Sequence, residues 1–149
     1  MPKLASSWAA NALLKLARLA VAEERSERFL KLITEVRERI TEISVEEAAA
    51  AAERGAVLID VREKEEFRRG AIPRALHVPR STIEQEIEKR APDPSVPIIA
   101  YCARGNRSAL VVESLQRMGY TNVKLLSGGF QAWLESGRPA SRDTQFIED

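Results

Sequence analysis

From about residue 41 onward, short apolar runs alternate with segments that have the length and spacing of helices. The clearest run is residues 57–61, whose continuous apolar character is typical of a strand buried on both faces. Shorter runs predict further strands at residues 75–78, 97–101 and 123–126. Helices are predicted at residues 63–69, 107–118 and 129–136. This alternation predicts an α/β domain with a mostly parallel sheet and helices on both faces.

Two short patterns mark where further helices begin. The segment from Ser44 to Glu47 has the serine and the glutamate of a capping box, and its alanine-rich helix is predicted to end at Gly55. Residues 81–84 have the same pattern, and the helix that they open is predicted to end before Pro92.

The N-terminal segment has a different pattern. Residues 4–40 are predicted to be helical in two pieces, separated by a polar break at residues 23–28. The second piece has apolar residues at alternating spacings of four and three, which is typical of a narrow helical seam, namely Phe29, Ile33, Val36, Ile40 and Ile43. We interpret this segment as helices that pack on the domain or, alternatively, as an element through which two copies form a homodimer.

The same patterns predict the limits of the domains and bear on the location of the protein. We expect an N-terminal helical extension at residues 1–39, a main domain at residues 40–140 and a C-terminal tail at residues 141–149. The uncharged stretch Leu4–Leu14 falls well short of the roughly 20 residues that span a bilayer. A secretory signal and a mitochondrial presequence stay open as alternatives, and a cytoplasmic location is favoured.

The composition argues against several classes of function. The chain has 23 basic and 22 acidic residues, so no strong field indicates a nucleic acid or a membrane as partner. A single cysteine cannot form an internal disulfide, which suits a reducing compartment. One cysteine and one histidine provide no ligand pair with metal-site spacing, and we expect neither a metal nor another cofactor.

The only cysteine lies where chemistry is expected. Cys102 follows a predicted strand directly, and the next residues, Ala103, Arg104, Gly105, Asn106 and Arg107, lead into a predicted helix. Backbone amides of such a loop and the N-terminus of the helix both favour negative charge. Neighbouring guanidinium groups and a helix N-terminus also lower the pKa of a thiol, so we predict an ionised thiolate in an anion-binding loop.

Three blocks of sequence together resemble the rhodanese family of sulfurtransferases. They are residues 60–62 (Asp-Val-Arg), residues 101–108 around the cysteine, and residues 128–133, which run from two glycines to a tryptophan. The resemblance extends from about Ile40 to Pro139 and implies the rhodanese fold, with a mostly parallel sheet of five strands. One segment departs from the family pattern, because Ala71 and Arg74 stand where members often have histidine and glycine.

The resemblance implies a reaction in which Cys102 takes a sulfane sulfur from thiosulfate or a related small anionic donor. The resulting persulfide then passes the sulfur to a thiol, to cyanide or to an acceptor protein. The amides from Ala103 through Arg107, including that of Asn106, would surround the sulfur, and Gly105 would permit the tight turn. Arg104 and Arg107 would bind the anionic donor.

Three residues outside the loop, Arg62, Asp60 and His77, are also considered in this interpretation. The resemblance implies that Arg62 lies beside the loop, where it either completes the anion site or forms a structural ion pair. Asp60 is expected to brace the strand end rather than to act as a base. The only histidine, His77, is expected to be packed or on the surface, since no motif places it near Cys102.

Two other classes of function remain as alternatives. Phosphatases and arsenate reductases of related design also use a thiolate in a loop of amides, but they place five residues between cysteine and arginine. Here four residues separate Cys102 from Arg107, so the smaller loop suits one sulfur atom better than a phosphate. The second alternative is a binding or regulatory module that keeps the fold but does not catalyse.

Overall fold

A computed structural model describes residues 9–15 and 26–142 of the chain. The chain divides between Glu35 and Val36 into two units. Residues 9–15 are helical, and helix α2 (Glu27–Arg37) extends across the division. The other parts of the predicted N-terminal helices, residues 4–8 and 16–25, lie outside the described residues. Among the described residues, no helix is both long and apolar enough to cross a membrane.

The second unit contains a sheet of five parallel strands in the spatial order β1-β5-β4-β2-β3. The strands are β1 (Thr41–Ile43), β2 (Val57–Asp60), β3 (Leu76–His77), β4 (Ile98–Tyr101) and β5 (Val123–Leu126). This confirms the predicted α/β class, the parallel sheet and the positions of four strands. The sequence pattern does not reveal the fifth strand, β1.

The segment around β1 corrects the predicted helical seam. Helix α2 ends at Arg37, and a turn follows in which the amide of Arg39 donates to the carbonyl of Val36 at 2.9 Å. Ile43 therefore belongs to a strand that pairs with β5, in register with Leu126. The prediction was wrong beyond residue 37 because pairing with a strand some 80 residues away overrides a local spacing of three or four.

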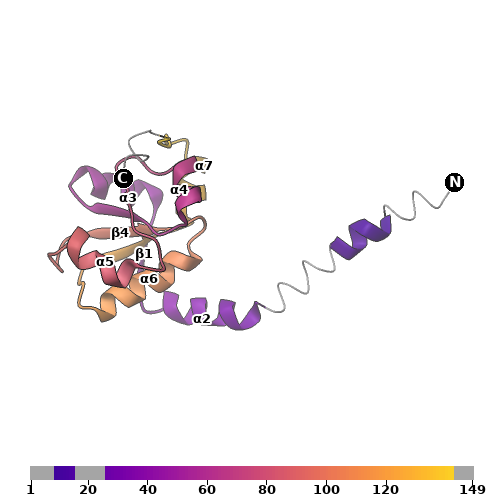
Figure 1. Cartoon of the computed structure of the whole chain (residues 1–149), viewed down its shortest axis with the longest axis horizontal. Coiled ribbons are helices and arrows are strands. Elements are labelled where there is room, and N and C mark those ends of the chain that lie inside the picture. The colour runs from indigo at the N-terminus through magenta and orange to yellow at the C-terminus, as the bar shows by residue number, and fades with distance from the viewer. Residues whose placement is uncertain (1–8, 16–25, 143–149) are drawn as a thin grey trace. The chain divides into compact units, whose positions relative to one another are not determined.

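The helices cover both faces of the sheet, as predicted, with α5 and α6 on one side and α3, α4 and α7 on the other (Figure 1). Successive strand residues face opposite sides, which produces two cores. Ile59 and Ala100 pack with residues of α5 and α6. Leu58 and Ile99 pack with residues of α3, α4 and α7. The helices are α3 (Val45–Glu53), α4 (Lys64–Arg69), α5 (Ile83–Arg90), α6 (Asn106–Arg117) and α7 (Gly129–Glu135).

One of the two predicted capping boxes is present. The amide of Glu47 donates to Ser44 Oγ at 3.1 Å, and the amide of Ser44 donates to Glu47 Oε1 at 3.2 Å. The predicted box at residues 81–84 is wrong, since residues 80–82 form a turn and α5 begins one residue later, with Thr82 as its N-cap. The Thr82 hydroxyl contacts Glu86 Oε2 at 3.4 Å and makes no capping hydrogen bond. The helix ends before Pro92, as predicted.

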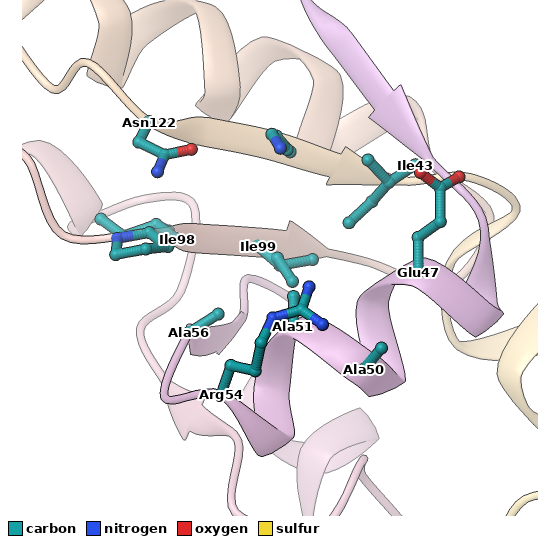
Figure 2. Close-up of a pocket in the computed structure, with 11 residues that line it drawn as sticks. Ile43, Glu47, Ala50, Ala51, Arg54, Ala56, Ile98, Ile99 and Asn122 are labelled. Atoms are coloured by element: carbon teal, nitrogen blue, oxygen red, sulfur yellow. The ribbon is translucent and has the colours of Figure 1, made fainter.

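The short alanine side chains of α3 leave clefts along both of its flanks. Figure 2 shows the cleft between α3 and strands β4 and β5, which has a volume of about 370 Å³ and is lined by Ile98, Ile99 and Arg54 among others. A second cleft of about 500 Å³ lies on the other flank and reaches Trp133. The lining of neither cleft includes Cys102.

The C-terminal end of the described chain pairs with the segment that precedes β3. The amide of Ala71 donates to the carbonyl of Ser141 at 3.0 Å, and the amide of Ser141 donates back at 2.8 Å. Arg142 Nε adds a hydrogen bond of 2.8 Å to the carbonyl of Arg69. The first two residues of the predicted tail are thus attached to the main domain, and residues 143–149 lie outside the described residues.

Candidate functional site

Cys102 lies at the carboxyl edge of the parallel sheet, directly after β4. In the adjacent strand β2, Asp60 is in register with Tyr101, so the two strand ends meet side by side. Ligands of open α/β sheets bind at this edge, which is where the sequence placed the cysteine and Asp60. Only 1% of Cys102 is exposed, so its sulfur faces the loop rather than open solvent.

Two groups contact the sulfur directly. The Gly105 amide donates to Cys102 Sγ at 3.0 Å, and the Ser108 hydroxyl lies 3.3 Å from it. Burial opposes ionisation of the thiol. Hydrogen bonds from the Ser108 hydroxyl and from the amides of Ser108, Gly105 and Arg104 outweigh it, and the pKa of Cys102 is lowered from its ordinary value. The site therefore favours a thiolate, as predicted from the sequence.

The loop has this shape because a glycine ends it and a helix begins there. Gly105 has a φ of 118° and is the N-cap residue of α6. Only glycine adopts such a conformation without strain, and it turns the chain so that its own amide points back at Sγ. Helix α6 then starts at Asn106, which places the positive end of a helix with 12 residues beside the thiolate.

The first turn of α7 holds the loop from behind. The amide of Phe130 donates to the carbonyl of Cys102 at 2.8 Å, and the amide of Gln131 donates to that of Ala103 at 3.1 Å. A Cβ atom on Gly129 would lie 2.5 Å from the carbonyl oxygen of Cys102, so no side chain fits there. Gly129 therefore packs directly against the reactive loop, whereas a Cβ atom on Gly128 would meet Ala132 of α7 itself.

Arg107 is fixed by a carboxylate from another helix. Its two terminal nitrogens donate to Glu66 Oε1 at 2.7 Å and to Oε2 at 3.0 Å. Glu66 is itself positioned at the start of α4, where it accepts from the amide of Glu63 at 3.2 Å. The hydrogen bond from Arg107 is the main cause of a lowered pKa of Glu66. Arg107 also interacts with the charge of Cys102, so it links α4 to the thiolate.

Arg62 is buried and paired, which matches one of its two expected roles. Its guanidinium donates to Asp60 through Nε at 3.0 Å and Nη2 at 2.7 Å, and Nη2 also donates to the carbonyl of Gly70 at 2.6 Å. The guanidinium lies 4.4 Å from the ring centre of Phe130. These are the contacts of a structural ion pair, with Asp60 bracing the strand end. Binding of substrate by Arg62 stays a prediction.

The remaining candidates occupy separate places around the loop. Arg104 is exposed at its tip, and Ala103 and Asn106 are half-buried. His77 stacks on Phe67 with 4.6 Å between ring centres, and its Nε2 lies 2.8 Å from the carbonyl of Arg62. His77 is thus a packed residue at the strand edge. The direct contacts of Cys102 come instead from the loop and from the first turn of α6.

Two residues of the site, Ser108 and Glu66, were not predicted from the sequence. Ser108 touches the sulfur, and its only signal is its position in the first helical turn, six residues after Cys102. Glu66 holds Arg107 from 41 residues away. The Glu-x-x-Glu pattern at the start of a short helix marks Glu66 as a helix-start residue but does not indicate its partner.

The described residues contain no group of three or more histidine, cysteine, aspartate or glutamate side chains that could hold a metal ion. The polar groups around Cys102 are hydrogen-bond donors to its sulfur rather than ligands for a metal. The arrangement is therefore suited to nucleophilic chemistry at sulfur, with negative charge stabilised by amides and a hydroxyl.

Comparisons with known proteins agree with this site. The model of the rhodanese-like domain matches residues 44–136, which include the whole reactive loop. A thiosulfate sulfurtransferase GlpE of Pseudomonas savastanoi is 35% identical over 91 residues, which is 61% of this chain and 84% of the relative.

Two solved structures have the same fold. A Rhodopseudomonas palustris protein described as a possible tyrosine phosphatase has a TM-score of 0.68 and 30% identity, over 76% of this chain and 93% of its own. A thiosulfate sulfurtransferase from Pseudomonas aeruginosa has a TM-score of 0.66 and 27% identity, over 72% and 21% of the respective chains. Together with the family match over most of the chain, the parallel sheet and the cysteine loop at its carboxyl edge show that this chain belongs to the rhodanese-like domain family.

Proposed function

We propose that this protein is a sulfurtransferase that carries a sulfane sulfur as a persulfide on Cys102. The observation that carries the proposal is the contact of the Gly105 amide and the Ser108 hydroxyl with Cys102 Sγ, at 3.0 and 3.3 Å. These donors stabilise a thiolate before the transfer and a negatively charged outer sulfur after it. The relatives named as thiosulfate sulfurtransferases support the same class of reaction.

The reaction proceeds in two displacement steps. The thiolate of Cys102 attacks the outer sulfur of thiosulfate, and the sulfur–sulfur bond breaks with its electron pair leaving on sulfite. The enzyme then holds a persulfide, whose outer sulfur is attacked by a thiolate acceptor or by cyanide. The bond to Sγ breaks, its electron pair returns to Cys102, and the thiolate is restored without a net oxidant or reductant.

The size of the loop favours sulfur over phosphate as the transferred group. Four residues separate Cys102 from Arg107, and Cys102 is 1% exposed. A single sulfur atom adds little volume next to Sγ, whereas a phosphoryl group must bring three further oxygens into the same short loop. The possible phosphatase among the structural neighbours makes this comparison worth testing directly.

Mass spectrometry of the intact protein after incubation with thiosulfate tests the proposal. Because Cys102 is the only cysteine, a gain of one sulfur atom can be assigned to it without mapping. The sulfur should be removed by cyanide and should be absent from Cys102→Ser. Hydrolysis of an aryl phosphate without any gain of sulfur would favour the phosphatase alternative, and the absence of both activities would favour a binding module.

Two further elements of the sequence analysis belong to this proposal. The sulfur acceptor is a thiol, either small or on another protein, and the domain of residues 40–140 contains Cys102 and its loop. Self-association through the N-terminal segment stays a prediction. Deletion of residues 1–38 should abolish a dimer in sedimentation if that segment holds it together, and an unchanged oligomeric state would contradict this role.

A further inference from the structure

The last residue of α2 places a cation against the reactive loop. A Cβ atom on Gly105 would lie 2.9 Å from Nη2 of Arg37, so the guanidinium occupies the space that a side chain would need. The Nε of Arg37 pairs with Glu42 Oε1 at 3.2 Å, which directs the far end of the side chain toward the loop. Arg37 precedes the part of the chain that matches the family, which begins at residue 44.

Two of the arginines that the sequence suggested for the anion site already form ion pairs with carboxylates. Arg62 is enclosed by Asp60 and the carbonyl of Gly70, and 5% of it is exposed. Arg107 gives both of its terminal nitrogens to Glu66. Terminal nitrogens of both residues are already hydrogen-bonded to protein oxygens, so neither guanidinium offers a free pair of terminal nitrogens to a sulfonate.

Arg37 differs from these two in how it is held. Its contact with Glu42 uses Nε, and Nη2 lies at the loop. Its side chain is 39% exposed, so an incoming anion can reach it from solvent. Arg104, at the exposed tip of the same loop, is a second cation within the part of the chain that the structure describes.

We propose that Arg37 is a specificity-determining residue that holds the anionic half of the sulfur donor at the reactive loop. This inference rests on the proposed function. The sulfite half of thiosulfate carries the charge that leaves, and a guanidinium binds such a group through its terminal nitrogens. The end of α2, which precedes the part of the chain that matches the family, thereby contributes to the choice of donor, and Gly105 serves both the turn and the approach of Arg37.

Binding of the donor by Arg37 is distinct from an effect on the pKa of Cys102. The groups that lower the pKa of Cys102 are hydrogen-bond donors of its own loop and helix, with Ser108 first among them. Arg37 should therefore change the preference for charged over neutral reagents and leave the ionisation of the thiol in place. The two effects can be measured separately.

Alkylation of Cys102 by iodoacetate and by iodoacetamide provides the test, because the reagents differ chiefly in charge. For Arg37→Ala we expect the rate with iodoacetate to fall by about threefold to tenfold and the rate with iodoacetamide to stay within about twofold. Arg39→Ala is the matched control: Arg39 lies two residues away and pairs with Glu113 at 2.7 Å. Neither rate should change in this control, and Arg37→Lys should retain part of the preference.

The kinetics of the reaction with thiosulfate then test whether Arg37 binds the donor. In Arg37→Ala the KM for thiosulfate should rise by about threefold to tenfold, with kcat changed less. An equal loss of both alkylation rates would show that Arg37 only supports the loop and would overturn the inference. If wild-type protein never gains sulfur, the proposed function fails, while the ratio of alkylation rates still decides whether Arg37 selects anions.

Discussion

The ends of strands β2 and β4 lie side by side, yet they are built for different tasks. At the end of β2, Asp60 and Arg62 form a buried ion pair. Asp60 is 0% exposed and Arg62 is 5% exposed. After β4, Cys102 is surrounded by donors, and the arginine that accompanies it, Arg107, pairs with Glu66 where about a third of each side chain is exposed. The enclosed pair holds two segments together, whereas the half-exposed pair borders the reactive sulfur.

The comparison teaches that an arginine next to an active loop is not by itself a binding group. A buried guanidinium that is paired with a buried carboxylate contributes rigidity, because releasing it for a ligand would leave that carboxylate unpaired. A half-exposed guanidinium loses less when it exchanges partners. Substitutions at the two strand ends should therefore affect stability at one end and reactivity at the other.

The largest effect is expected when the buried pair is broken. Asp60→Ala leaves Arg62 buried without its carboxylate, and the free energy of unfolding should fall by about 3–5 kcal/mol. Urea denaturation measures this loss. A change below about 1 kcal/mol would place the pair in the class of exposed ion pairs and remove the contrast between the two strand ends.

The next largest loss of stability is expected when a side chain is added at Gly129, which packs against the cysteine loop. Gly129 and Gly137 have φ values of 61° and 84°, but only at Gly129 would a Cβ atom meet the loop, 2.5 Å from the carbonyl of Cys102. Gly137→Ala should cost about 1 kcal/mol for its backbone conformation alone. Gly129→Ala should cost about 1–3 kcal/mol more because the loop must shift.

The alkylation rate of Cys102 distinguishes these two glycine variants further. It should change in Gly129→Ala, where the loop is displaced, and stay at the wild-type value in Gly137→Ala. Equal rates in both variants would mean that α7 does not position the loop.

A smaller effect is expected on the ionisation of the thiol. Ser108→Ala removes the side-chain hydrogen bond to Sγ, which should raise the pKa of Cys102 toward the ordinary thiol value. The pH dependence of alkylation by iodoacetamide measures it, with a wild-type midpoint below 9.0, the thiol's ordinary value. Ser114→Ala is the control in the same helix, since Ser114 contacts Glu84 instead.

The direction of the linked stability change follows from the lowered pKa. The thiol of Cys102 ionises more readily in the folded protein, so this group stabilises the fold fully above the unfolded pKa. The contribution is lost as the pH falls through the folded value. In Ser108→Ala this dependence on pH should weaken, and an unchanged midpoint of alkylation would remove Ser108 from the site.

The smallest effect on stability is expected at the half-exposed pair. Glu66→Gln should lower the free energy of unfolding by less than about 1 kcal/mol, because solvent screens the pair with Arg107. Sulfur transfer should change more than stability does, since Arg107 loses its anchor beside the thiolate. Glu65→Gln is the neighbouring control, as Glu65 pairs with exposed Arg68 at 3.4 Å. A loss of stability as large as that of Asp60→Ala would contradict the comparison.

Among the described residues, Arg74 has a left-handed backbone conformation although it is not a glycine. Arg74 has a φ of 72°, and the resemblance places glycine at this position in other members. The structure thus has, at the position that the resemblance singles out, a backbone conformation that favours glycine.

Much of the architecture could be predicted from local pattern. The apolar runs indicated β2, β4 and β5 because buried parallel strands need apolar residues on both faces. Ser44 and Glu47 indicated the start of α3 because that pairing satisfies amides at a helix end. The cysteine, the glycine and the helix that follows them along the chain indicated a thiolate in a loop of amides.

Only the tertiary structure decided which residues and strands that are far apart in the chain contact each other. The strand β1 exists through pairing with β5, Glu66 reaches Arg107 from another helix, and Arg37 meets Gly105 from the end of α2. Local sequence determines which groups a segment can offer, since capping, turn formation and apolar spacing act over a few residues. Which of two distant charges or strands actually meet depends on how the whole chain packs, because the free energy of such a contact exists only once the fold has brought its members together.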